Sequence, residues 1–323
     1  MAADDPGRDA VELRVSVTVS GLSRLFGGDL GAVVEMAAQA DALGLHRIAV
    51  PDHLAIGPRT DRYPYGRFPL PDDEPWPEPL LLLAAMASRT RRIRLATGVL
   101  IAPARPPLLL AKSAATLDVL CGGRLDLGVG VGWQREELEA AGVPWAERFA
   151  RLDEGLRACR ALWRDAPASF TGRTLHFEAL RCEPRPVQPG GPPVWMGLAA
   201  TERHVRRMAE LAAGWMPMDS RPEALREGLA RLRPALEAAG RTAAGFGVRA
   251  NAPVVRGGDG WPDLEAALAG LPALAEAGAT DASFALAAFC RSRADVAPFL
   301  ERLARASAAA GQGFSGRGDP RTR

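Results

Sequence analysis

The stretch Ile93–Trp133, IRLATGVLIAPARPPLLLAKSAATLDVLCGGRLDLGVGVGW, decides the fold of this chain. It reads as a strand, a turn that contains glycine, a long apolar helix, and a second strand that ends in closely spaced glycines. Short apolar strands that alternate with helices are typical of βα units in a parallel sheet. The loops at the carboxyl ends of such strands are where α/β scaffolds bind cofactors.

The same alternation continues along the chain and predicts eight strands, each followed by a helix. The expected strands are 13–19, 47–50, 93–97, 124–128, 193–197, 214–217, 245–250 and 280–285. The expected helices are 30–43, 80–90, 108–120, 146–163, 202–212, 223–239, 262–277 and 293–309. Eight βα pairs predict an α/β protein with a (β/α)8 TIM barrel, and a doubly wound sheet is the main competitor. We expect a single barrel domain over residues 11–310 and a disordered tail over 311–323.

Two stretches fit no βα unit, and we interpret them as insertions after strands 2 and 4. Leu54–Pro79 is rich in Pro, Asp and Tyr, and Ala166–Pro192 is expected to contain a hairpin around Thr171–Leu180. The first insertion follows the carboxyl end of a strand, where barrel chemistry occurs. We therefore expect it to be an active-site lid.

Composition and charge exclude several classes of function. A net charge of +2 gives no reason to expect nucleic acid or a membrane surface as a partner. The four cysteines are widely spaced and form no CxxC, so neither a metal site nor a disulfide framework is expected. The first residues lack the apolar core of a secretory signal. We expect a cytoplasmic protein that acts on a small-molecule substrate.

Asp52 and His53 directly follow the strand that ends in RIAVP, so both should lie at the catalytic end of a barrel. His53 can donate a proton or polarise a carbonyl, and Asp52 can accept hydrogen bonds from a heterocycle. The alternative is that Asp52 caps the loop and His53 is a structural histidine. The residue types alone favour that alternative.

Three further candidates are glycine-containing or small-residue strand ends. Thr97-Gly98-Val99 and Gly130-Val131-Gly132-Trp133 let a flat ligand approach the backbone, or are an ordinary turn and core packing. The spacing GxGxG is not the dinucleotide pattern GxGxxG. Ala199-Ala200-Thr201 precedes a helix, whose free N–H groups suit a phosphate. Tyr63 and Tyr65, the only tyrosines, lie in the expected lid and are candidate substrate donors.

Taken together, the motifs resemble the luciferase-like monooxygenase superfamily, and within it the branch of oxidoreductases that depend on the deazaflavin coenzyme F420. The resemblance is close over Leu13–Pro217 and looser beyond. The motifs that carry it are PDHL at 51–54, YPYGRFPLPDDEPWPEPL at 63–80, ATGVLIAP at 96–103, LAKSAATLDVLCGGRLDLGVGVGW at 110–133, RFARLDEGLRACRALW at 148–163, FTG at 170–172 and PRPVQPGGPPVWMG at 184–197.

The resemblance implies a (β/α)8 barrel and assigns roles to the candidate residues. Asp52 would contact the cofactor ring and His53 would act as proton donor. A non-proline cis peptide would lie behind the ring at Gly98–Val99. Gly130–Trp133 would line the cofactor, and residues 199–203 would receive its phosphate. Relatives often form dimers, so a homodimer is one expectation.

Two departures from the family pattern bear on the substrate and on the phosphate. A sugar-phosphate dehydrogenase branch carries a glutamate where this chain has Trp133, which disfavours sugar phosphates and favours a less polar substrate. Many relatives have Gly-Gly or Gly-Ser in the phosphate turn, whereas this chain has Leu198-Ala199-Ala200-Thr201.

The leading hypothesis is an enzyme that transfers a hydride between coenzyme F420 and a small organic substrate. An FMN-dependent monooxygenase of the same superfamily, which uses oxygen, is the main alternative. A non-catalytic flavin-binding protein is the second, because Trp133 replaces an acid–base residue.

Overall fold

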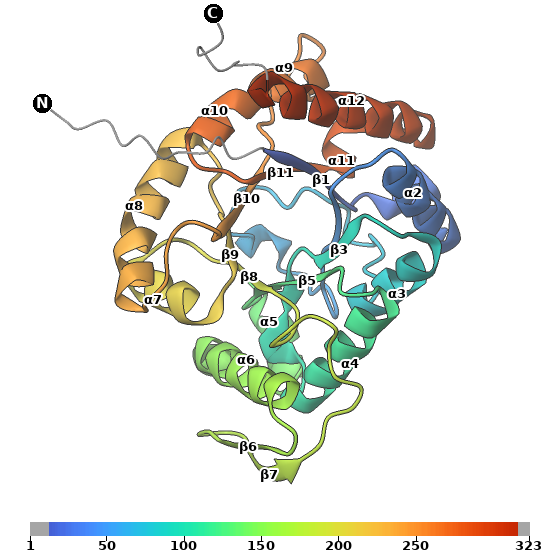
Figure 1. The fold of residues 1–323 in the computed structure, drawn as a ribbon. Helices are drawn as coiled ribbons and strands as arrows, with labels where there is room; N and C mark the ends of the chain where they lie inside the picture. The colour runs from blue at the N-terminus through green and yellow to red at the C-terminus, as the bar shows by residue number, and fades with distance from the viewer. Residues whose placement is uncertain (1–12, 316–323) are drawn as a thin grey trace, which may run out of the picture.

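The computed structural model describes residues 13–315. Eight parallel strands close into a barrel, and helices surround it (Figure 1). The barrel strands are β1 Arg14–Thr18, β2 Arg47–Val50, β3 Arg94–Thr97, β5 Leu125–Gly130, β8 Val194–Gly197, β9 Gly214–Met216, β10 Gly247–Asn251 and β11 Asp281–Ala285. The short strand β4, Leu100–Ile101, pairs only with β5.

The order of the strands confirms the predicted barrel. The sheet runs β3-β2-β1-β11-β10-β9-β8-β5, and a further pairing of β3 with β5 closes it, with Leu95 opposite Leu125. A doubly wound sheet is open at both edges, so this closure excludes it. All eight predicted strands are present, and their bounds differ from the predicted ones by two residues at most.

Helices connect the strands on the outside of the barrel. They are α1 Leu22–Phe26, α2 Leu30–Ala42, α3 Pro79–Arg89, α4 Pro107–Leu120, α5 Arg135–Ala140, α6 Arg148–Arg164, α7 Glu202–Leu211, α8 Pro222–Ala238, α9 Leu264–Ala269, α10 Leu271–Glu276, α11 Leu286–Phe289 and α12 Val296–Ser315. Four single-turn 3-10 helices are η1 Thr60–Arg62, η2 Ala102–Ala104, η3 Trp145–Glu147 and η4 Arg293–Asp295.

The prediction of one continuous helix over residues 262–277 was wrong. Residues 262–277 form two helices, α9 and α10, which meet at Gly270. Pro272 has no N–H to donate back along the helix, and its ring clashes with a continuing helical turn, so a new helix begins here. The predicted tail over 311–323 lies largely outside the described residues, and α12 runs to Ser315. The domain bounds stay a prediction.

The two insertions lie at opposite ends of the barrel. Leu54–Pro79 follows β2 and lies at the carboxyl end of the strands. The hairpin of β6 Ala168–Thr171 and β7 His176–Leu180 confirms the predicted hairpin. It follows α6 rather than a strand, and so leads to the amino end of β8 (Figure 1). Only the first insertion can therefore cover an active site at the carboxyl ends.

Charged side chains fill the barrel interior at the amino end. Arg47, 3% exposed, donates from Nε to Asp126 over 2.8 Å and pairs with Asp281, while Arg94 binds Asp126 over 2.6 Å. Burial opposes the charge of Asp126, but the Arg94 hydrogen bonds and the charge of Arg47 hold its pKa below the ordinary value. These residues near the starts of the strands stabilise the closed barrel at its amino end.

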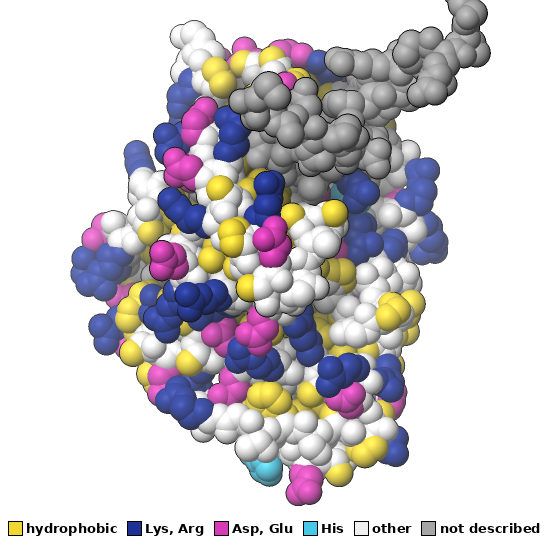
Figure 2. Space-filling view, turned by 60° about the vertical axis from the view of Figure 1, so that its left-hand side comes forward, with side chains coloured by type: hydrophobic (Ala, Val, Ile, Leu, Met, Phe, Trp, Pro, Cys, Tyr) yellow, Lys and Arg dark blue, Asp and Glu magenta, His cyan; other side chains and the backbone are white. Residues whose placement is uncertain are grey.

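The outer surface carries charges of both signs. On the face shown in Figure 2, basic and acidic side chains are interspersed, without a broad area of one sign. None of the helices in the described part of the chain has the length and apolar character that a membrane span requires.

Candidate active site

His53 lies buried at the carboxyl end of β2 and is held by two partners. Its Nδ1 atom lies 2.9 Å from Oε2 of Glu137, and the indole Nε1 of Trp133 donates to its Nε2 over 3.2 Å. An indole N–H is a donor only, so Nε2 is the acceptor. The ring proton of neutral His53 is therefore on Nδ1, which donates to the Glu137 carboxylate.

Glu137 was missed by sequence reasoning. It lies on α5, is 4% exposed, and its second oxygen accepts from the backbone N–H groups of Leu54 and Ala55 at 2.5 and 3.3 Å. The carboxylate thus fixes both the His53 ring and the first residues of the lid. The only signal in the sequence is its place one helical turn after Trp133, within a polar segment that reads as a solvated helix.

Asp52 is buried next to His53, and both of its oxygens have protein partners. They accept from the Ile101 N–H at 2.9 Å and from Arg105 at 2.6 and 3.0 Å. Burial opposes the charge of Arg105, but the hydrogen bonds and charge of Asp52 raise its pKa above the ordinary value. This geometry supports a loop-stabilising role for Asp52, and its contact with a cofactor ring stays a prediction.

The peptide bond between Gly98 and Val99 is cis, as the resemblance implies. Thr97 Oγ1 donates to Gly128 O over 2.6 Å and ties β3 to β5 at this point. A Cβ on Gly130 would lie 2.8 Å from Val99 Cγ2, and one on Gly197 would lie 2.8 Å from Val99 Cγ1. The glycines at the ends of β5 and β8 therefore make room for the two methyl groups of Val99.

This packing places part of the predicted cofactor-binding set together. Thr97, Gly98, Val99 and Gly130 meet at the mouth of the barrel. Val131 and Gly132 continue from β5 toward Trp133 and are half-buried. Because the Val99 side chain packs against the Gly130 backbone, this contact is sufficient to explain why residue 130 is a glycine. Direct contact of Gly130, Val131 or Gly132 with a cofactor stays a prediction.

The predicted phosphate turn lies between β8 and α7. Thr201 caps α7, because its hydroxyl accepts from His204 N at 3.4 Å, and Ala199 and Thr201 are exposed. His204 stacks on Phe149 with ring centroids 5.0 Å apart, and Arg148 lies 4.8 Å from the same ring. The turn before α7 thus has exposed small residues and a guanidinium in its neighbourhood, which suits an anion, and Glu202 is the first residue of the helix.

Tyr63 and Tyr65 belong to an aromatic cluster that joins the lid to the barrel. We define this cluster as Tyr63, Tyr65, Phe68, Trp76 and Trp133. Tyr63 lies 5.2 Å from Trp133, and Trp76 lies 4.8 Å from His53, between ring centroids. Tyr65 is half exposed and reaches Met218, which follows β9, over 2.7 Å from its hydroxyl. The lid therefore crosses the mouth of the barrel above His53.

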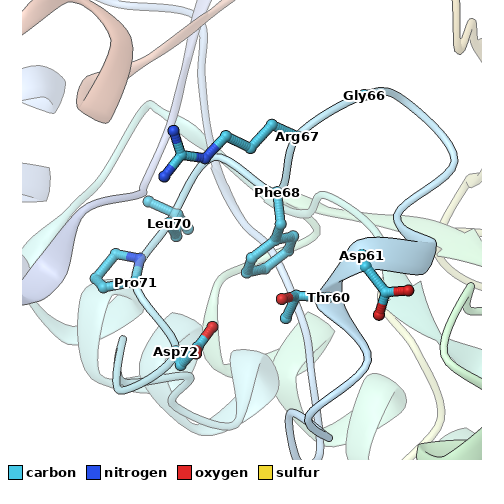
Figure 3. Close-up of a pocket in the computed structure, with 8 residues that line it drawn as sticks. All are labelled: Thr60, Asp61, Gly66, Arg67, Phe68, Leu70, Pro71 and Asp72. Atoms are coloured by element: carbon cyan, nitrogen blue, oxygen red, sulfur yellow. The ribbon is translucent and has the colours of Figure 1, made fainter.

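The lid is held at both ends and is open in its middle. Gly57 exchanges two hydrogen bonds with the Gln134 side chain, at 2.7 and 3.1 Å, and Glu74 accepts from Leu22 N. Between these anchors lies a hollow of about 530 Å³ (Figure 3). It is lined by Thr60, Asp61, Gly66, Arg67, Phe68, Leu70, Pro71 and Asp72.

Arg249 on β10 is a second residue that sequence reasoning missed. It is 4% exposed, forms no ion pair with any described residue, and donates from Nη2 to Met216 Sδ over 3.1 Å. A Cβ on Gly98 would lie 3.1 Å from the same Nη2 atom. Burial and the charge of Arg47 lower the pKa of Arg249 to about 10. A buried cation thus lies directly below the cis peptide.

A model of the luciferase-like monooxygenase family matches residues 14–321. The chain belongs to this family. The luciferase-like barrel is 36% identical to an uncharacterized protein of Mycobacterium tuberculosis over 294 residues, which are 87% of this chain and 95% of that one.

Relatives of known name fall in two groups. The luciferase-like barrel is 34% identical to an F420-dependent glucose-6-phosphate dehydrogenase of Amycolatopsis mediterranei. The match spans 173 residues, which are 50% of this chain and 48% of the dehydrogenase. It is 31% identical over 141 residues to an FMNH2-dependent dimethylsulfone monooxygenase of Pseudomonas putida, 43% of this chain and 38% of that one. Among solved structures, an F420-dependent secondary alcohol dehydrogenase has the same fold, with a TM-score of 0.75 at 15% identity over 93% of this chain and 99% of that one. The chain is therefore an enzyme of the luciferase-like oxidoreductase class.

Proposed function

We propose that the protein transfers a hydride between coenzyme F420 and a small organic substrate. The observation that carries this proposal is the His53–Glu137 pair at the carboxyl end of β2, together with the cis peptide Gly98–Val99 at the carboxyl end of the neighbouring strand β3. The match to an F420-dependent dehydrogenase over half of the chain supports it. When bound, the deazaflavin supplies a ring carbon that accepts or gives the hydride.

The residues at the mouth fit such a cofactor. The Gly98–Val99 backbone and the Val99 side chain form a wall without large groups, against which a flat ring can lie. The turn before α7 at Ala199, Ala200 and Thr201, whose first and last residues are exposed, would offer N–H groups to a phosphate. Arg148 forms no ion pair with any described residue; its guanidinium lies 3.6 Å from the centroid of the Trp145 ring and 4.8 Å from that of Phe149, and its Nη1 donates to the Trp145 carbonyl. These contacts are proposals for the residues that would hold the ring and the phosphate.

His53 accounts for the proton that accompanies hydride transfer. In the direction of substrate oxidation, its Nε2 atom accepts the proton from a substrate hydroxyl in place of the Trp133 N–H. The Glu137 carboxylate then stabilises the imidazolium through Nδ1–H. In the reverse direction the imidazolium returns the proton. Tyr63 and the rest of the aromatic cluster exclude water from this exchange, because the lid covers His53.

The alternative is an FMN-dependent monooxygenase, and the match to the FMNH2-dependent enzyme supports it. A non-catalytic flavin-binding protein is the further alternative. The cytoplasmic location and the homodimer also stay predictions.

Cofactor binding tests the proposal directly. Fluorescence quenching and calorimetry would compare F420 and FMN in parallel on the full chain. Micromolar or tighter binding of F420 with at least tenfold weaker binding of FMN is the expected result. A preference for FMN would move the protein to the oxygen-using alternative.

The variant His53→Ala separates catalysis from binding. We expect F420 to bind with unchanged affinity and turnover to fall about a hundredfold or more, because the proton carrier is lost. His176→Ala, an exposed histidine of the β6–β7 hairpin, is the matched control. Unchanged turnover in His53→Ala would remove His53 from the reaction and favour the non-catalytic alternative.

A further inference from the structure

A second hollow, of about 470 Å³, lies between the lid and the connection from β10 to α9. Two guanidinium groups and four apolar side chains line it, and four of these six residues also line the first hollow, whose wall includes Asp61 and Asp72. The six residues are Arg67, Phe68, Pro69, Leu70, Pro71 and Arg256. Figure 3 shows the Arg67 side chain extending over Leu70 on the lid side of this region.

Neither arginine is neutralised by the protein. Arg67 and Arg256 form no ion pair with any described residue, and Nη1 of Arg256 donates to the Gly260 carbonyl over 2.8 Å. Two other arginines of the lid do form ion pairs. Arg59 pairs with Asp61 at 2.8 Å and Arg62 with Glu136 at 3.1 Å. Arg67 and Arg256 thus face the hollow without a carboxylate partner among the described residues.

The hollow adjoins the catalytic side of the mouth. Phe68 is part of its wall and also of the aromatic cluster, with its ring centroid 6.4 Å from that of His53 and 5.6 Å from that of Trp133. A ligand in the hollow is thus one aromatic ring away from the proton carrier.

The walls of the hollow follow β2 and β10. The phosphate turn follows β8, which is separated from β10 by β9 alone and from β2 by β3 and β5. The order of the strands therefore does not separate the hollow from a cofactor tail, and the binding experiment below makes that distinction.

We infer that this hollow binds a carboxylate on a substrate whose flat, apolar body lies against Phe68 and reaches His53. Two guanidinium groups bind a carboxylate through charge-assisted hydrogen bonds, and Phe68, Leu70 and the prolines bury an apolar ring. The substrate role rests on the proposed function. The anion site itself rests only on the lining of the hollow.

Binding of a matched pair of probes tests the inference. Calorimetry with 2-naphthoate and its neutral analogue 2-naphthamide would use the full chain without added cofactor. We expect 2-naphthoate to bind at least tenfold more tightly than the amide. In the variant R67Q/R256Q this advantage is lost, while binding of the amide is unchanged. The control R206Q/R233Q removes two exposed arginines of α7 and α8 and should behave as the unaltered protein.

Three outcomes would overturn the inference. They are equal binding of the two probes, an absence of 2-naphthoate binding at millimolar concentration, and unchanged 2-naphthoate binding in R67Q/R256Q. A further arm distinguishes the substrate from the anionic tail of F420. If R67Q/R256Q weakens F420 tenfold but leaves the tail-less deazaflavin core unaffected, the site belongs to the cofactor tail and the substrate assignment is wrong. Because the probes are measured without cofactor, failure of the F420 proposal would not change their result.

Discussion

The Nδ1 atom of His53 and the Oε2 atom of Glu137 lie 2.9 Å apart, with both side chains buried. This contact fixes which ring nitrogen carries the proton, and it leaves Nε2 as the acceptor of the Trp133 indole N–H. The lid begins at the same carboxylate, through Leu54 and Ala55. The orientation of His53 and the position of the lid therefore depend on one side chain.

Glu137→Gln should impair turnover without unfolding the protein. The amide oxygen of the new side chain would still accept from the Leu54 and Ala55 N–H groups, so the amide N–H₂ would face His53 Nδ1. The ring proton then moves to Nε2, where it opposes the Trp133 N–H. We expect kcat to fall about 10- to 100-fold, with cofactor affinity changed less than about threefold. Steady-state kinetics and calorimetry would measure both quantities.

Glu136→Gln is the control for that variant, because Glu136 lies next in sequence, is partly exposed and has Arg62 as its ion-pair partner among the described residues. It should keep kcat within about twofold. Equal losses in the two variants would show that α5 as a whole, rather than the Glu137–His53 contact, matters for turnover.

Gly130→Ala should destabilise the barrel through a contact with Val99. The new Cβ would lie 2.8 Å from Val99 Cγ2, so the strand end or the side chain must shift. We expect a loss of about 1–3 kcal/mol in the free energy of unfolding, measured with urea. Adding Val99→Ala should recover part of this loss, because it removes the clashing methyl groups.

The control for Gly130→Ala is Gly258→Ala, where no atom lies within 4 Å of the new Cβ. It should change the free energy of unfolding by less than about 0.5 kcal/mol. If Val99→Ala gives no recovery in the Gly130→Ala background, the steric explanation for the glycine is wrong.

The sequence predicts the barrel well because its signal is local and repeated. Each strand is a short apolar run with a glycine or polar residue at its end, and these runs need no tertiary information. The contact among Val99, Gly130 and Gly197 has no such signal. It depends on three strand ends that meet only when β3, β5 and β8 are in register. The glycines could be identified from the sequence, but the methyl groups that require them could not.

The two missed residues show the same limit in the candidate site. Glu137 stands in REELEA, where only the fold shows which of the adjacent glutamates turns inward. Arg249 lies in a short strand whose sequence, GVRAN, does not show whether its arginine faces the barrel interior or the helices. Burial of a charged residue follows from closure of the barrel, which composition and periodicity do not encode.

Arg249→Met should stabilise the protein and weaken cofactor binding. The cation is buried, has no carboxylate partner within residues 13–315, and is repelled by the charge of Arg47, which costs stability. An unbranched apolar side chain removes that cost, so we expect the melting temperature to rise by a few degrees. We expect about tenfold weaker binding of the preferred cofactor, because the positive charge below Gly98–Val99 is lost. Calorimetric melting and binding would test both; a fall in melting temperature with unchanged binding would show a purely structural role.

His46 should make the stability of the protein depend on pH. Burial, and then the charge of Arg47, lower the pKa of His46 from 6.5 to about 4. The unfolded chain therefore binds a proton below pH 6.5 that the folded protein resists binding. The stability from neutral His46 is complete above pH 6.5 and is lost as the pH falls toward 4, by on the order of 1–2 kcal/mol after allowance for its partial exposure. Urea unfolding from pH 7 to 4 should show a smaller decline in His46→Gln than in the unaltered protein, and parallel curves would assign the acid sensitivity to other groups.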